Sequence, residues 1–431
     1  MKKNVQDFYW SKLDNAARLY ALVSSISATN VFRFSVKMSE PIKPVLLQKA
    51  VEQALDDMPP FKVKLKTGLF WYYFEMNHAK PKVREEYTYP CSKISRYTNN
   101  GYLFNVTYYE KMIHLEVFHA LGDGGGLMQF IKVILHHYLR LMYPDLVAPN
   151  LNILKESLSS QALQEDSFLS IPTKTKTNLV PKLDDAYKVE GIKMNYPELK
   201  VIHGIMPPKE VIKLAKEKQV TLSCYLSSLL IYSIYTQNQK FSKSSAPISI
   251  CVPIDLRNQF ESETIRNFFT NITLTVKVNP SMTFDDILAQ VAKQLEEKNS
   301  IDLISSKIND NVSAQKNMFI RPVPLVIKNM VLRLIYRRAD KGFTTTLSNL
   351  GRITMPEELL PFIEDFRVMI SVTPHQPIRC AVSSLQDNFV FSFTSVMEDT
   401  DIQKFFFRYL QRQGVNVTIS SNEEINYEIL S

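Results

Sequence analysis

The residues with the clearest chemical potential are His119 and Asp123, which lie four positions apart. Upstream of them, Ile113, Leu115 and Val117 alternate with polar residues, and this period of two is typical of a half-buried strand. His119 is in phase with the apolar positions, so we expect its imidazole to point inward. A buried imidazole loses its hydration unless both ring nitrogens find partners. The pattern therefore predicts either a structural histidine whose ring nitrogens are both hydrogen-bonded or a histidine with a catalytic role.

Glycine residues surround Asp123. Four of the protein's 11 glycines lie within residues 122–126. Because glycine has no Cβ, such a run permits a tight turn and lets a ligand approach the backbone closely. Apolar residues then recur at helical spacing from Leu127 to Leu141, which predicts a long buried helix. The whole stretch is predicted to be a strand, an inward histidine, a tight turn and a helix.

The segment Phe118–Gly124, FHALGDG, resembles the His-His-x-x-x-Asp-Gly motif of the coenzyme A-dependent acyltransferase superfamily. This superfamily includes chloramphenicol acetyltransferases, condensation domains of peptide synthetases, polyketide-associated acyltransferases and alcohol acetyltransferases. His119 matches the second histidine of the motif, which is the catalytic one. Phe118 stands where the motif has its first histidine, and this departure bears on how the substrate is handled.

Three further stretches resemble the same superfamily and follow in the same order along the chain. Residues 18–22, RLYAL, resemble the end of the first condensation-domain motif. Residues 252–258, VPIDLRN, and 265–269, IRNFF, resemble a strand and turn of alcohol acetyltransferases. Residues 344–351, TTTLSNLG, resemble the second-lobe motif that faces the catalytic channel. The resemblance therefore extends from Arg18 to Gly351.

The resemblance implies an α/β fold of two chloramphenicol acetyltransferase-like lobes with a substrate channel between them. We expect an N-terminal lobe at residues 1–165, which carries the motif, and a C-terminal lobe at residues 201–431. Residues 166–200 would form the crossover between the lobes. Residues 144–198 are rich in Pro, Ser, Thr, Lys and Asp, which suits a linker or a loop that covers the substrate.

The resemblance also implies a reaction, in which an acyl group, with acetyl expected, moves from acyl-coenzyme A to a small alcohol. A neutral imidazole has a reference pKa of about 6.5, so His119 suits the role of general base. The tetrahedral oxyanion needs hydrogen-bond donors. The candidates along the channel are Gly124, Ser348 and Asn349, although Ser348 and Asn349 also fit a simple turn.

In the superfamily the carboxylate of the motif pairs with an arginine and holds the loop. Asp123 is therefore expected to organise the turn rather than to act as an acid. Arg18 and Arg257 are the structural candidates for its partner, and Lys62 could substitute for them. The alternative for Arg257 is a solvated arginine in a turn.

Composition and missing motifs count against several other classes, namely metalloproteases, ATPases, serine hydrolases and dinucleotide-binding proteins. The chain has 431 residues and a formal net charge of +8, without an apolar run long enough for a transmembrane helix. No nucleic-acid motif accompanies the charge, and there is no P-loop, Gly-x-Ser-x-Gly, Gly-x-Gly-x-x-Gly or HExxH pattern. The four cysteines lack paired spacing, which favours reduced thiols in a cytoplasmic protein over a zinc site. We expect neither a permanently bound cofactor nor a metal.

Residues 323–338, VPLVIKNMVLRLIYRR, predict an apolar helix with a basic C-terminal end. A packed helix is favoured, and weak contact with a membrane surface is the alternative. Two other functional classes also stay open. One is a condensation-type enzyme that takes its acyl group from the phosphopantetheine arm of an acyl carrier protein. The other is a non-catalytic member of the superfamily that binds ligands without reacting.

Overall fold

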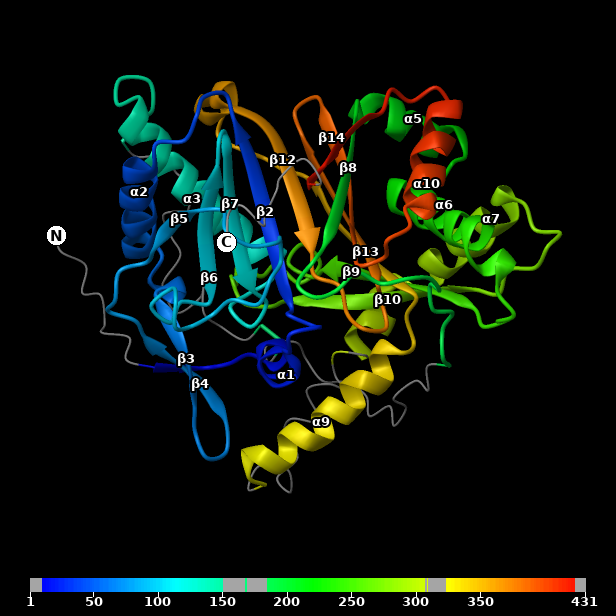
Figure 1. The fold of residues 1–431 in the computed structure, drawn as a ribbon, viewed down its shortest axis with the longest axis horizontal. Coiled ribbons are helices and arrows are strands. Elements are labelled where there is room, and N and C mark those ends of the chain that lie inside the picture. Colours follow the sequence, from blue (N-terminus) through cyan, green and yellow to red (C-terminus); the bar gives the residue numbers. More distant parts are fainter. Residues whose placement is uncertain (1–9, 150–166, 169–183, 307, 309–322, 423–431) are drawn as a thin grey trace.

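The computed structural model describes residues 10–149, 167–168, 184–306, 308 and 323–422. Two lobes lie side by side in Figure 1, each built on one main sheet with helices packed against it. The α/β architecture predicted from the sequence is therefore present. Of the predicted crossover at residues 166–200, residues 166 and 169–183 lie outside the described residues.

The sheet of the first lobe has five strands in the order β12-β2-β7-β6-β5. Their bounds are Ile363–Ile370, Val31–Met38, Met112–Phe118, Phe104–Tyr109 and Val83–Glu85. Helices α2 (Pro44–Asp57) and α3 (Gly124–Met142) share one hydrophobic core with this sheet. Strand β7 contains the alternating residues Ile113, Leu115 and Val117, as the sequence predicted. The long buried helix predicted after the glycine turn is α3.

A small sheet lies beside the first lobe, in the order β1-β4-β3. The strands are β1 (Trp10–Lys12), β4 (Tyr72–Met76) and β3 (Val63–Thr67). The β3–β4 hairpin extends downward in Figure 1 toward α9.

The sheet of the second lobe has seven strands in the order β10-β9-β11-β13-β14-β8-β15. In that order they span Phe269–Val276, Ile248–Asp255, Thr345–Arg352, Ile378–Leu385, Asn388–Ser395, Lys200–Met206 and Thr418–Ser421. The helices that pack on it are α5 (Pro208–Glu217), α6 (Leu222–Gln237), α7 (Phe284–Lys298) and α10 (Asp401–Arg412). Thr221 caps α6 by accepting a hydrogen bond from the backbone N–H of Cys224. Thr283 and Asp286 form a capping box on α7.

One strand joins the two lobes. β12 belongs to the part of the chain that the sequence assigns to the second lobe, yet it pairs antiparallel with β2 of the first. The register runs from Ile363 opposite Met38 to Ile370 opposite Phe32. The lobe boundaries at residues 165 and 201 stay a prediction. They would assign β12 to the second lobe, although it belongs to the sheet of the first.

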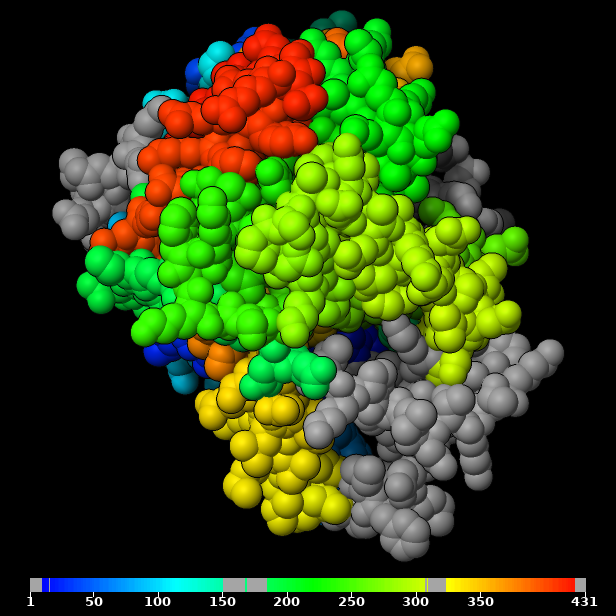
Figure 2. Space-filling model, turned by 90° about the vertical axis from the view of Figure 1, so that its right-hand side faces the viewer, coloured from blue at the N-terminus to red at the C-terminus, as the bar shows by residue number. Residues whose placement is uncertain are grey.

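Helix α9 (Leu325–Asp340) projects from the body of the protein, at the bottom of Figure 1 and in yellow in Figure 2. It rests on α1 (Asn15–Val23), where Leu325 forms a small cluster with Leu22 and Val23. Other apolar side chains of α9 are exposed, including Val326 at 80% and Met330 at 66%. The helix is therefore packed along one narrow side only. Among the described residues, no helix is long and apolar enough to cross a membrane.

Candidate active site

His119 follows the end of β7 and lies among aromatic rings. Its imidazole stacks on Tyr20 with ring centroids 4.3 Å apart, and it meets the ring of Phe32 at 5.1 Å and that of Phe269 at 5.7 Å. Burial lowers the pKa of His119, although the charge of Asp123 acts in the opposite direction. The imidazole is therefore neutral near pH 7, which is the form that accepts a proton.

An asparagine from the second lobe orients the imidazole. Nδ1 of His119 lies 3.0 Å from Oδ1 of Asn267. Nδ2 of Asn267 donates to Oδ2 of Asp14 at 3.1 Å and to the carbonyl oxygen of His119 at 3.2 Å. This set of partners assigns the amide oxygen to His119, so Nδ1 of His119 carries the proton. Nε2 of His119 is then the basic nitrogen.

Asp14 holds that asparagine from a third element. Its carboxylate caps α1 by accepting a hydrogen bond from the backbone N–H of Ala17 at 2.7 Å. Asp14 is 3% exposed and Asn267 is 1% exposed, so both side chains are fixed inside the protein. Asp14 lies outside every stretch that resembles the superfamily, and Asn267 belongs to the resembling stretch at residues 265–269. Their contact joins residues 253 positions apart, and no local pattern predicts it.

Asp123 is engaged through both of its carboxylate oxygens. Oδ1 accepts from the backbone N–H of Gly126 at 3.1 Å, which caps α3. Oδ2 accepts from the backbone N–H of Phe268 at 2.7 Å. The guanidinium of Arg257 adds a bidentate contact, with Nη2 2.7 Å from Oδ1 and Nη1 3.1 Å from Oδ2. With both oxygens committed, Asp123 is placed to organise the turn.

Arg257 is therefore the cation that faces Asp123, rather than the solvated arginine of the alternative. Burial opposes its charge, but Asp123 and then Asp255 outweigh burial and raise the pKa of Arg257. The other candidates lie elsewhere. Nε of Arg18 donates to the carbonyl oxygen of Leu13 at 3.1 Å. Lys62 pairs with Asp56 at 2.7 Å.

The glycines of the turn allow another segment of the protein, rather than a ligand, to pack closely against them. A Cβ placed on Gly122 would lie 2.7 Å from the carbonyl oxygen of Ile265, and one on Gly126 would lie 2.1 Å from it. A Cβ on Gly125 would lie 2.7 Å from Nη1 of Arg257. Close approach is thus required between the turn and the 265–268 segment, and it places Asn267 beside His119. Gly124 lines the cavity described next.

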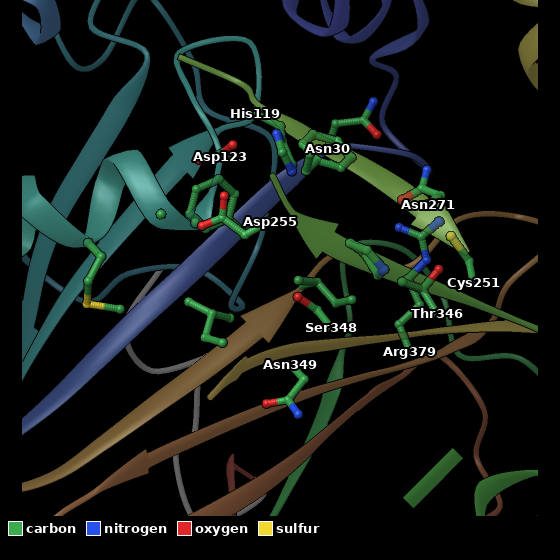
Figure 3. Close-up of a pocket in the computed structure, with 18 of the residues that line it drawn as sticks. Asn30, His119, Asp123, Cys251, Asp255, Asn271, Thr346, Ser348, Asn349 and Arg379 are labelled. Carbon is green, nitrogen blue, oxygen red and sulfur yellow. The ribbon is translucent and has the colours of Figure 1, made fainter. Parts of the chain in front are cut away.

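A cavity of about 570 Å³ lies between the lobes, and His119 and Ser348 form part of its wall (Figure 3). Gly124 and Asn349 also line it. All the predicted channel residues therefore meet at one cavity. Among the described residues, no group of three or more His, Cys, Asp or Glu side chains is arranged to hold a metal ion.

Ser348 and Asn349 differ in what their side chains do. The amide of Asn349 donates to Oγ of Ser223 at 2.9 Å, and its oxygen accepts from the backbone N–H of Gly351 at 2.8 Å. The sequence predicted a strand that ends in a turn here, but β11 continues to Arg352 with an irregular register after Asn349. In Figure 3 the hydroxyl of Ser348 points toward the middle of the cavity, and Asn349 lies farther from His119. Ser348 is the better placed donor of the two.

Another part of the cavity wall carries charged groups that sequence reasoning missed. Nε of Arg379 donates to Oε1 of Gln376 at 3.2 Å, and Nη1 donates to the carbonyl oxygen of Ser371 at 3.1 Å. Nη2 lies 3.8 Å from Oδ1 of Asp340, the last residue of α9. Arg379 sits on β13 inside an otherwise ordinary strand pattern, so the sequence offered no signal for it.

The fold was compared with known proteins. No family model and no curated protein matches the sequence. Three solved structures show the relationship of the fold. TRI101 from F. sporotrichioides, complexed with coenzyme A and T-2, matches with a TM-score of 0.63 and 11% identity, over 95% of this chain and 99% of that one. TRI3 trichothecene 15-O-acetyltransferase from Fusarium sporotrichioides matches with a TM-score of 0.58 and 9% identity, over 94% of both chains.

The third structure is the condensation domain of Monacolin K polyketide synthase MokA. It matches with a TM-score of 0.56 and 12% identity, over 94% of this chain and 96% of that domain. At these identities the likeness establishes the fold. The described chain therefore has the two-lobed fold shared by these acetyltransferases and condensation domains, as the motif resemblance implied.

Proposed function

We propose that this protein, which has the fold of coenzyme A-dependent acyltransferases, moves an acyl group from acyl-coenzyme A to the hydroxyl of a small alcohol. The observation that carries the proposal is the arrangement of His119 on the wall of the cavity between the lobes. Its Nδ1 is held by Asn267, its pKa is lowered by burial, and Nε2 is the basic nitrogen. A neutral, oriented imidazole is what a general base requires.

In the proposed reaction, Nε2 of His119 takes the hydroxyl proton as the acceptor oxygen attacks the thioester carbon. The resulting oxyanion accepts a hydrogen bond from the hydroxyl of Ser348. The intermediate then collapses, its carbon–sulfur bond breaks, and the thiolate of coenzyme A receives the proton from His119. Asp123 and Arg257 maintain the turn that places the imidazole, and they exchange no proton.

The identity of the two substrates is part of the proposal. TRI101 was solved with coenzyme A and T-2, and TRI3 is named as an O-acetyltransferase, which supports free acyl-coenzyme A as donor and an alcohol as acceptor. Acetyl is the proposed acyl group. Coenzyme A would be a co-substrate that enters and leaves at each turnover.

A second candidate function takes the acyl group from the phosphopantetheine arm of a carrier protein. The likeness to the condensation domain of MokA favours it. Under this proposal His119 has the same role, but free acyl-coenzyme A does not react. A member that binds without reacting is the remaining alternative.

The proposed function is tested by incubating the protein with a series of acyl-coenzyme A donors and alcohol or amine acceptors, with release of free thiol as the readout. We expect thiol release that depends on the acceptor. His119→Ala should lower the rate by about 10²–10⁴-fold, which is the usual contribution of a general base. Turnover only with an acyl carrier protein would favour the second candidate. Full turnover by His119→Ala would exclude His119 as the base.

A further inference from the structure

The outer side of α9 is unusually apolar for a helix on a protein surface. Its packed side includes Leu325, which is buried, and Leu332 and Tyr336, which are partly buried in the cluster with α1. These residues lie seven and four positions apart, so they share one side of the helix. The opposite side carries six large apolar residues that are all at least 48% exposed: Val326, Ile327, Met330, Val331, Leu334 and Ile335. These positions form a continuous face along three turns of the helix. A contiguous exposed face of this kind marks an interaction site.

The apolar face continues onto the β3–β4 hairpin. The backbone N–H of Leu325 donates to the carbonyl oxygen of Leu69 at 3.0 Å, so the tip of the hairpin lies against the first turn of α9. At this tip Leu69 is 72% exposed and Trp71 is 54% exposed. Tryptophan is enriched where proteins meet the interface of a bilayer, because its ring is apolar and its N–H is polar.

Charge distinguishes this face from an ordinary apolar patch. Residues 325–341 contain five basic side chains, at positions 328, 333, 337, 338 and 341. Lys328 and Arg333 donate to the carbonyl oxygens of Phe70 and Leu22 on the body of the protein. Arg337, Arg338 and Lys341 follow Met330 and Leu334 at helical spacing, so they extend the exposed face at its C-terminal end, where Arg338 also pairs with Asp185 at 3.3 Å. The one acidic residue of this stretch, Asp340, is 6% exposed and faces the protein interior. An apolar face bordered by basic side chains matches the chemistry of an anionic lipid surface, where acyl chains lie beneath negative headgroups.

We propose that α9 and the tip of the β3–β4 hairpin form a docking surface for anionic membranes. The helix lies in the plane of the interface, with Met330 and Leu334 in the acyl boundary and with Arg337, Arg338 and Lys341 at the headgroups. The same helix reaches the cavity, because Tyr336 and Asp340 line it. The docked helix therefore also forms part of the cavity wall. This contact is independent of the proposed acyl transfer.

Vesicle binding tests the proposal directly. The full chain is mixed with vesicles of phosphatidylcholine containing phosphatidylserine and sedimented, with pure phosphatidylcholine vesicles as the comparison. We expect binding to the anionic vesicles that weakens with salt. The double variant Met330→Glu/Leu334→Glu should bind at least about tenfold more weakly. It removes apolar groups that enter the lipid and adds negative charges that the anionic headgroups repel. Both positions are exposed, at 66% and 60%, so the fold should be retained.

Phe241→Glu is the matched control, since Phe241 is 77% exposed but lies in the second lobe, in the short 3-10 helix Gln239–Phe241 that follows α6. It should bind vesicles as the unaltered chain does. The chain has two tryptophans, so Trp10→Phe leaves Trp71 as the single reporter. Lipids brominated near the headgroup should quench the fluorescence of Trp71 on binding, and this quenching should be absent in the double variant.

Three results would overturn the proposal. One is the absence of binding to anionic vesicles by the full chain. Another is equal loss of binding in Phe241→Glu and the double variant. The third is a dimer in lipid-free sedimentation equilibrium that the double variant dissociates, without any vesicle binding, which would make the face a contact between two copies of the chain.

Discussion

The imidazole of His119 and the amide of Asn267 come from different lobes and meet at 3.0 Å. The proton on Nδ1 of His119, and with it the basicity of Nε2, therefore depends on how the lobes are seated against each other. Asp14 completes the arrangement by holding the amide from α1.

Replacing Asn267 with Ala should lower kcat by about 100-fold, because an orienting contact is lost and a misplacement of about 1 Å can cost that much. Steady-state kinetics of thiol release measure the change. Asn271→Ala is the comparison, since Asn271 also lines the cavity and is expected to alter KM rather than kcat. Equal kcat values for Asn267→Ala and the unaltered enzyme would remove Asn267 from the catalytic arrangement.

Asp123→Asn should destabilise the protein by about 3–5 kcal/mol, because it leaves the largely buried charge of Arg257 without its main partner. Asp255→Asn offers a matched control on the same arginine. The side chain of Asp255 is 48% exposed against 7% for Asp123, so its loss should cost at most about 1 kcal/mol. Urea unfolding of both variants gives the comparison, and similar midpoints would show that Asp123 does not organise the turn.

Ser348→Ala should reduce kcat by about 10²–10³-fold if its hydroxyl donates to the oxyanion. Asn349→Ala should have the smaller effect on kcat, because its amide is already engaged with Ser223 and Gly351. The two variants are compared under saturating substrate. A larger loss in Asn349→Ala would reverse the choice of donor.

The free energy of unfolding should fall as pH decreases below about 6.5, the ordinary pKa of histidine. Burial, followed by the charges of Arg367 and Arg33, holds the pKa of His203 well below that value. The unfolded chain then takes up a proton that the folded chain excludes, so acid favours unfolding. Each excluded proton contributes a slope of about 1.4 kcal/mol per pH unit.

Urea midpoints measured between pH 7.5 and pH 5.5 follow this change. His203→Gln, which can still bond to the hydroxyl of Ser392 that His203 contacts at 2.8 Å, should reduce the slope. A slope unchanged in His203→Gln would assign the acid sensitivity to other groups.

Coenzyme A should stabilise the protein against heat. A ligand that binds only the folded state contributes about 2.7 kcal/mol at a hundredfold excess over Kd, which corresponds here to a rise in Tm of at least about 1–2 °C. His119→Ala should keep this rise, because the imidazole acts on the acceptor. The absence of any shift with coenzyme A or acetyl-coenzyme A at millimolar concentration would favour the carrier-protein candidate.

Local patterns were sufficient for much of the fold and for the centre of the site. The alternation before His119 and the helical spacing from Leu127 to Leu141 predicted β7 and α3. What the sequence left open depends on contacts between distant segments. Arg18 and Arg257 were both candidates, with Lys62 as a possible substitute, because only the packing of the 265–268 segment on the glycine turn decides which cation reaches Asp123. The exposed face of α9 is a second example. The apolar pattern of residues 323–338 favoured a packed helix, and only the folded arrangement decides which of its side chains are left exposed.

The strand β12 has a consequence for how the protein is made. Its partner β2 is complete early in synthesis, but the edge of β2 that β12 covers stays open until Ile370 has been added. Open strand edges attract other chains, and pairing between such distant segments is slow. The nascent chain therefore exposes an aggregation-prone edge for most of its translation. A fragment cut between the lobes would keep that edge permanently, so neither half is suited to production on its own.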